Sequence, residues 1–130
     1  MTVHETGGPY FDELAVGHIY DTAPAITLTE GLSAVHQSIV GDRLRLPLDV
    51  HLSKAVTGAD TAVANPGLVC DLAIGQSTLV THHVKATLFY RGLRFHRFPH
   101  IGDTIHTRTE VVGLREPPVW PCPSSGQAGV

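Results

Sequence analysis

Residues 65–75 have the sequence NPGLVCDLAIG, which predicts a helix that is apolar almost all the way round. Asn65 can cap its amino end, and Pro66 suits the first helical position. A helix without a polar face is usually buried, so we expect the rest of the chain to enclose this one. Asp71 is its single charge and must either emerge at a gap or find a partner.

A second helix, amphipathic this time, is predicted upstream. Thr27 and Glu30 stand at capping-box spacing, and Gly41 ends the pattern. The positions between them that recur at helical spacing are Leu32, Val35, His36, Ile39 and Val40. Residues 43–64 have no clear period, and only the sequence DVHLSKAV at 49–56 favours a short helix.

The pattern changes to strands from residue 82 onward. Residues 82–95 are rich in aromatic and branched side chains, whereas residues 102–114 alternate along the chain, and PHIGD at 99–103 supplies the turn. An earlier extended segment, residues 17–30, is broken near Pro24. This order predicts an α+β fold in which an antiparallel sheet wraps around the central apolar helix.

The composition limits the classes of function. A chain of 130 residues with 42% hydrophobic content supports one domain, and a net charge of −3 gives no general reason to bind nucleic acid. No apolar run approaches the roughly 18 residues of a membrane span, and no leader is evident, so we expect a cytoplasmic protein with no membrane partner. Cys70 and Cys122 are far apart and lack zinc-ligand spacing, so no metal is expected.

Several segments resemble the MaoC-like dehydratases, a branch of the hot-dog fold. They are YFDELAVGHIYDT (10–22), TEGLSAVHQSIVGD (29–42), NPGLVCDLAIG (65–75) and LFYRGLRFHRFPHIGDTIHTRTEVVGL (88–114). The run GDRLRLPLD with LSKAVTG is most similar to the mesaconyl-CoA hydratase (β-methylmalyl-CoA dehydratase) branch. The resemblance implies addition or removal of water at an acyl-CoA thioester, no cofactor besides that substrate, and a homodimer.

Two departures from the family pattern stand out. The family continues its Gly–Asp with Asn-Pro-x-His, but Pro47 occupies the histidine position here, and the nearest histidine downstream is His51. The family sheet also gains strands where this chain has a proline-rich end. We therefore expect an incomplete hot-dog domain over residues 1–116, lacking its last strands, and a disordered tail over residues 117–130.

Three positions are candidates for catalytic roles. Asp42 matches the family aspartate and is the candidate base that activates water; the alternative is a solvated aspartate at a helix end. His51 is a weaker candidate for the acid that protonates the α-carbon, and a surface histidine is the alternative. Gly67 opens the central helix, where a backbone N–H without an intrahelical partner could bind the thioester oxygen, although close packing also explains a glycine there.

Arg94 and Arg97 are candidates for binding the phosphates of coenzyme A. Strand alternation would send them to opposite faces, and a solvated strand face is the plainer interpretation. His36 belongs to the apolar stripe of the second predicted helix (Leu32, Val35, His36, Ile39 and Val40) and is interpreted as a core histidine. Two other interpretations of the whole chain stay open: a non-catalytic module that binds acyl thioesters or forms dimers, and an inactive fragment.

Overall fold

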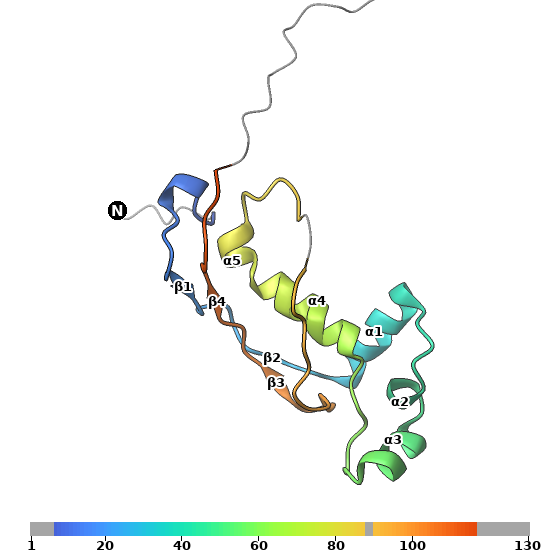
Figure 1. Cartoon of the computed structure of the whole chain (residues 1–130). Helices are drawn as coiled ribbons and strands as arrows, with labels where there is room; N and C mark the ends of the chain where they lie inside the picture. The colour runs from blue at the N-terminus through green and yellow to red at the C-terminus, as the bar shows by residue number, and fades with distance from the viewer. Residues whose placement is uncertain (1–6, 88–89, 117–130) are drawn as a thin grey trace, which may run out of the picture.

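The computed structural model describes residues 7–87 and 90–116. Its elements, in chain order, are η1 (Phe11–Glu13), β1 (Ile19–Tyr20), β2 (Ile26–Thr27), α1 (Glu30–Val40), α2 (Arg45–Leu48), α3 (Val50–Thr57), α4 (Pro66–Gln76), α5 (Thr78–Thr81), β3 (Thr104–Ile105) and β4 (Thr109–Glu110). Figure 1 shows the strands following one side of the long helix α4, with α1 beside its amino end and α2 and α3 beyond. The predicted tail and Cys122 lie outside the described residues.

The strands form two short antiparallel ladders. In one, β1 pairs with β4 so that Ile19 faces Glu110; in the other, β2 pairs with β3 so that Ile26 faces Ile105. Between the ladders, residues 21–25 lie opposite the shorter segment 106–108. The break predicted near Pro24 falls within residues 21–25. The predicted alternation is confirmed, because residues 101–111 alternate between half-buried and exposed positions.

Helix α4 is the predicted central helix. Asn65 caps it by accepting the Gly67 N–H at 2.7 Å, and Pro66 is its first residue. At its amino end the core forms around Leu28 and Ala64, which pack with the helix residue Leu68. At its other end, the buried Gln76 donates to the Pro24 carbonyl at 2.7 Å and so ties the helix to the break between the ladders.

The expected burial of the whole central helix is wrong for the described part of the chain. Within α4 only Leu68 and Gln76 are buried, and its other apolar residues are half-buried. The ladders are only two residues deep and cover one side of the helix. The opposite side borders an open cavity, described below, so its apolar surface stays partly accessible.

Helix α1 begins two residues later than its capping-box pattern indicated. Thr29, not Thr27, caps the helix by accepting the Leu32 N–H at 3.1 Å. Thr27 lies in β2, where its hydroxyl bonds that of Thr104 at 2.9 Å, because strand pairing competes for this residue. Gly41 ends the helix as predicted, with a left-handed φ of 64°.

Only part of the α1 stripe packs inward. Leu32 packs against the core and His36 faces α4, but the outer residues Val35, Ile39 and Val40 are exposed. A helix in contact with one neighbour buries only the narrow strip facing it, and the sequence pattern here is wider than that strip.

The strand predicted over residues 82–95 is wrong where the structure describes it. Residues 84–87 and 90–95 have no strand assignment, and α5 already occupies residues up to 81. Aromatic and branched composition favours a strand only where a neighbouring edge accepts the backbone hydrogen bonds. The short helix predicted at 49–56 is confirmed as α3, and α2 precedes it.

Candidate active site

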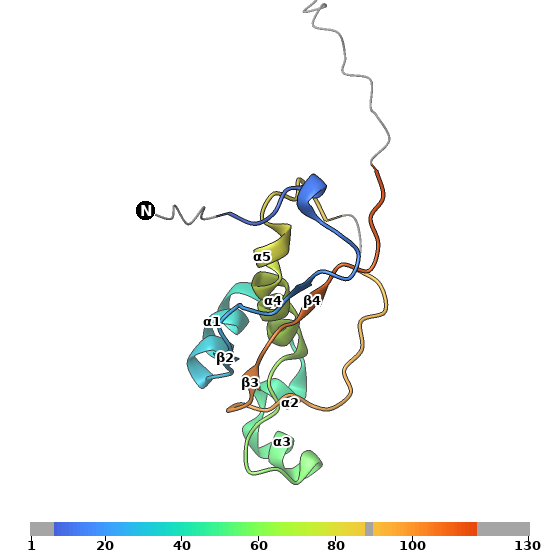
Figure 2. The same ribbon diagram turned by 90° about the vertical axis from the view of Figure 1, so that its left-hand side faces the viewer.

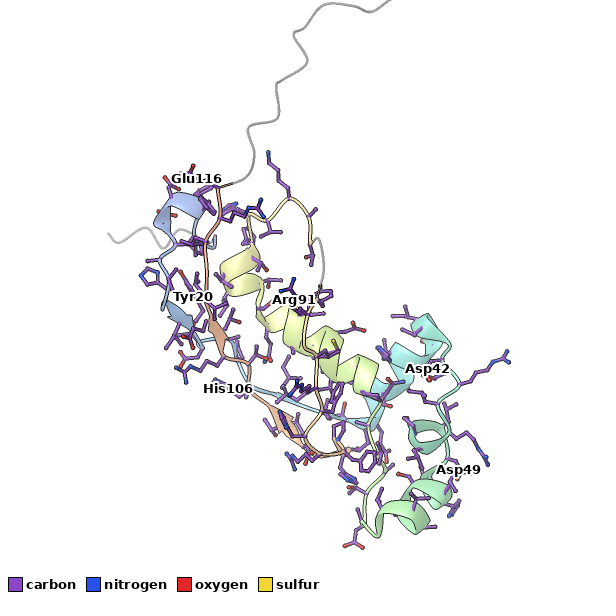
Figure 3. All side chains as sticks on the ribbon, viewed as in Figure 1. Tyr20, Asp42, Asp49, Arg91, His106 and Glu116 are labelled. Carbon is purple, nitrogen blue, oxygen red and sulfur yellow. The ribbon has the colours of Figure 1, made fainter. Side chains whose placement is uncertain are left out.

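Asp42 lies just after α1, opposite the amino end of α4 (Figure 3). Gly41 turns the chain there, and the Asp42 carbonyl accepts a 2.6 Å hydrogen bond from the Gln37 side chain, which anchors the turn to the helix. The half-buried carboxylate accepts the Leu44 N–H at 2.9 Å on one oxygen and a short hydrogen bond from Asn65 on the other. Two donors therefore hold the carboxylate in one orientation.

Asn65 connects this carboxylate to α4. Its side chain is buried, with Nδ2 donating to Asp42 and Oδ1 accepting from the Gly67 N–H. Asp42 thus lies one side chain away from the helix terminus, whose partial positive charge favours an anion.

The expectation that the Gly67 N–H is a free donor needs correction. In this structure the N–H is already paired with Asn65 Oδ1 at 2.7 Å, because the capping side chain reaches back over the first turn. A thioester oxygen could use this N–H only if the Asn65 carboxamide moved aside. The role of Gly67 as an oxyanion donor stays a prediction with that condition attached.

A hydrogen bond joins His36 and Asp71 across the contact between α1 and α4. His36 Nε2 lies 3.0 Å from Asp71 Oδ2, and the histidine side chain is 10% exposed against 63% for the aspartate. Asp71, the single charged residue of α4, is therefore paired, as the sequence predicted. The ring lies close to Gly67: a Cβ at that position would be in ordinary van der Waals contact with it, 3.5 Å from His36 Cε1 and 3.8 Å from Nε2.

Two cavities adjoin this cluster. One, of about 470 Å³, lies among α1, α2, α3 and the residues before α4, and Asn65 is part of its wall. The other, of about 370 Å³, has an apolar wall that includes Leu44 and Pro66. Pro47, the position of the family histidine, lines both cavities. An apolar ring therefore faces the space where the family pattern would place an imidazole.

A larger cavity, of about 930 Å³, separates α4 from residues 90–97. This segment passes α4 on its way to β3 and stands off from the helix on the side away from α1 (Figure 2). Arg94 and Arg97 both line the cavity, so the opposite faces expected from strand alternation are wrong. The segment has no strand pairing here and does not hold its side chains to a period of two. Arg97 also lies 3.6 Å from Asp103.

His51 is not part of the cluster. It is exposed on α3, and within residues 7–87 and 90–116 no hydrogen bond or ion pair joins it to Asp42. The histidine that lies at the amino end of α4 is His36, which the sequence had placed in the core.

The sequence analysis identified Asn65 only as a helix cap and Asp71 only as a charge that needs a hydrogen-bond partner or solvent. One signal could have gone further: Gly67 and Asp71 are four residues apart and so share a face of α4. A buried histidine on the neighbouring helix could then reach both.

No helix within residues 7–87 and 90–116 is long and apolar enough to cross a bilayer. In the same ranges, no three histidine, cysteine, aspartate or glutamate side chains gather as ligands for a metal ion.

No protein-family model matches the chain. It is 28% identical over 117 residues to the β-methylmalyl-CoA dehydratase of Chloroflexus aurantiacus, a match that covers 89% of this chain and 33% of that protein. It also matches the structure of a conserved hypothetical protein from Mycobacterium tuberculosis, essential for bacterial survival during infection, which has a double hot-dog fold. That match has a TM-score of 0.85 and 66% identity, and it covers 88% of this chain and 35% of the other.

The chain therefore spans about a third of the length of each of these two relatives. The structural match shows the fold, and the named relative comes from the branch that the segment GDRLRLPLD had indicated. The chain has the hot-dog fold, and the two comparisons confirm its resemblance to the MaoC-like dehydratases.

Proposed function

We propose that this chain carries part of the active site of an acyl-CoA hydratase/dehydratase, which adds or removes water at an α,β-unsaturated thioester. One observation carries the proposal: the Asp42 carboxylate is linked through Asn65 to the first N–H group of the central helix. The similarity to a β-methylmalyl-CoA dehydratase supports the same reaction class.

The proposed chemistry needs a base for water and a donor for the thioester oxygen. Asp42 is the proposed base, because Asn65 and the Leu44 N–H orient its carboxylate and each oxygen keeps a lone pair for water. Gly67 is the proposed donor once the Asn65 carboxamide has moved aside. The helix terminus would then face the negative charge that develops on the thioester oxygen.

The proposed substrate is a short, branched acyl-CoA of the mesaconyl type, in keeping with the name of the Chloroflexus relative. Arg94 and Arg97 are proposed to bind the coenzyme A phosphates, since both line the 930 Å³ cavity beside α4. The reaction needs no cofactor beyond this substrate.

The proposal is tested by incubating the purified chain with mesaconyl-CoA and following loss of the conjugated thioester. Asp42→Asn should lower the rate by at least about 10²-fold, because the amide cannot accept the proton from water. Asp49→Asn is the matched control: Asp49 caps α3 by accepting the Leu52 N–H at 2.9 Å, and asparagine caps equally well. Equal rates for the wild type and Asp42→Asn would remove Asp42 from the mechanism.

A second function, binding of acyl thioesters without turnover, has its own support. Pro47 faces the cavities in place of the family histidine, and the Gly67 N–H is occupied. Calorimetry with mesaconyl-CoA separates the two functions, since this one predicts saturable heat of binding while the thioester spectrum stays unchanged.

A cytoplasmic homodimer is the proposed form of the protein. Residues 90–98 support association, because Tyr90, Leu93, Phe95 and Phe98 are exposed there and the segment has no strand assignment. Analytical ultracentrifugation should give twice the mass of one chain, and a single-chain mass at all concentrations would contradict a dimer.

A further inference from the structure

The 930 Å³ cavity beside α4 borders β3 along three consecutive residues, Thr104, Ile105 and His106. Successive side chains of a strand point to opposite faces of its sheet, so a run of consecutive residues lines one cavity where the edge of the strand faces it. The His106 ring bonds the Asp21 carbonyl at 2.9 Å, in the segment on the other side of the ladder. The cavity therefore lies along the edge of β3 that β2 does not occupy.

This edge presents main-chain groups that the ladder does not use. The Asp103 carbonyl accepts the Leu28 N–H at 2.8 Å and so faces the chain that carries β2. Main-chain groups of a strand alternate between its two edges, so those of Thr104 and His106 face away from β2. Within residues 7–87 and 90–116, β3 belongs to a sheet of two strands. Such an edge is a template for pairing with a further strand.

The floor of the cavity is an apolar side of α4, where Val69, Cys70, Ala73 and Ile74 are each half-buried. A strand residue rises about 3.3 Å, lies about 4.8 Å from the next strand and belongs to a layer about 10 Å thick, which amounts to about 160 Å³ per residue. The cavity therefore has room for about six strand residues, which is an ordinary strand length.

The wall that faces α4 across the cavity carries positive charge from Arg94 and Arg97. The two acidic residues of the cavity wall already have partners, because Asp71 is bonded to His36 and Asp103 lies 3.6 Å from Arg97. Within the described residues no ion pair neutralises Arg94. Charge complementarity therefore favours an occupant with acidic side chains on the face turned toward this wall.

We propose that the cavity is the docking site for one β-strand of a partner polypeptide, which pairs with the free edge of β3. Its side chains alternate between apolar residues, which cover α4, and acidic residues, which face Arg94. The proposal goes beyond the proposed hydratase. Coenzyme A phosphates would share the arginines with this strand, but only the strand needs the edge of β3.

The probe is a synthetic peptide of about seven residues that alternates valine with glutamate and is blocked at both ends. Fluorescence anisotropy of the labelled peptide with the full chain should show saturable binding. A control peptide has the same residues in two separate blocks. It should bind at least about tenfold more weakly, because it cannot place apolar and acidic side chains on opposite faces. The alternating peptide should also slow hydrogen exchange of the Thr104 and His106 amides, measured by NMR.

Two pairs of variants test the edge and the charge. Thr104→Pro removes an N–H at a position where an edge strand accepts proline, and it should weaken peptide binding by about tenfold. Thr104→Val keeps this N–H, loses the same hydroxyl bond to Thr27, and should bind as the wild type does. Arg94→Glu should weaken binding by about tenfold at low salt. Arg43→Glu, at an exposed residue outside the cavity, should change it by less than about twofold.

Coenzyme A binding, measured by calorimetry, should be unchanged in Thr104→Pro, and an equal loss of both ligands would overturn the assignment to the edge. If Thr104→Pro does not fold, Arg94→Glu against Arg43→Glu decides. Equal affinity for the two peptides, or no saturable binding, would overturn the proposal. Amide protection of Thr104 and His106 that appears without peptide and rises with protein concentration would place a second copy on the edge and overturn it as well.

Discussion

The carboxamide of Asn65 donates a hydrogen bond to the carboxylate of Asp42, which lies 23 positions earlier in the chain. The same carboxamide accepts the first N–H of α4, so a single side chain joins the end of one helix region to the start of another. Replacement of Asn65 should therefore affect both the stability of α4 and the orientation of the proposed base.

Asn65→Asp separates these two roles, because aspartate still caps the Gly67 N–H but cannot donate to Asp42. Two carboxylates would then face each other, and we expect the free energy of unfolding to fall by about 1–3 kcal/mol at neutral pH. Acid should relieve this loss by protonating one of the pair. Urea denaturation at pH 7 and at pH 4 checks the prediction, with Asn65→Ala as the variant that loses the cap as well. A loss in Asn65→Asp that grows at the lower pH relative to wild type would contradict it.

Gly67 and Gly75 make a matched pair within α4. Alanine normally stabilises a helix interior over glycine by about 1 kcal/mol, and a Cβ at Gly75 would meet no atom within 4 Å. At Gly67 the added Cβ would lie 3.0 Å from Asn65 Oδ1, so the carboxamide, which two hydrogen bonds hold in place, would have to shift by a few tenths of an ångström. We expect Gly75→Ala to raise the melting temperature and Gly67→Ala to lower it while reducing the hydration rate. Equal stabilisation by both would show that Asn65 adapts freely.

Ser53 is fully buried on α3, and its hydroxyl accepts the Val63 N–H at 2.7 Å. Ser53→Ala leaves this N–H without an acceptor inside the protein. The expected loss is about 1–3 kcal/mol of unfolding free energy, measured by chemical denaturation. Ser38→Ala is the control, since its hydroxyl bonds the Val35 carbonyl on the exposed side of α1 and should matter by less than about 0.5 kcal/mol. Similar losses of unfolding free energy in the two variants would contradict the prediction that burial of the hydroxyl determines the loss.

Leu28 is 1% exposed at the centre of the core, whereas Ile39 is 78% exposed on α1. Leu28→Ala should cost about 2–5 kcal/mol, because it removes buried methyl groups and leaves a cavity between β2 and α4. Ile39→Ala should change stability by less than about 0.5 kcal/mol in the monomer. Thermal unfolding of both variants measures the difference. A large effect of Ile39→Ala that depends on protein concentration would instead place Ile39 in a contact between copies.

Much of the fold could be predicted because it depends on local chemistry. Asn65 and Pro66 begin a helix through capping and a fixed φ angle, and Gly41 ends one by adopting a left-handed conformation. Strand formation at residues 82–95 was predicted from composition and is absent where described, because a strand needs a neighbouring edge as well as suitable residues.

The proposed site likewise contains residues that the sequence identified and contacts that only the structure shows. Asp42 and Gly67 were found through the family pattern, but the occupied N–H of Gly67 and the exposed position of His51 depend on distances between helices. His36 was interpreted as a core histidine, and its side chain is 10% exposed, but spacing along α1 shows only that it faces inward and not which residue it meets there. Only the structure pairs its Nε2 with Asp71.

The sequence by itself determined where the central helix begins, where α1 ends, and which positions of the strands face inward, since each depends on residues a few places apart. The tertiary structure alone decided that Asn65 bridges Asp42 to Gly67 and that His36 pairs with Asp71. Such contacts arise when α1 packs against the amino end of α4. The relative placement of two helices depends on the summed packing of many side chains, which no short motif encodes.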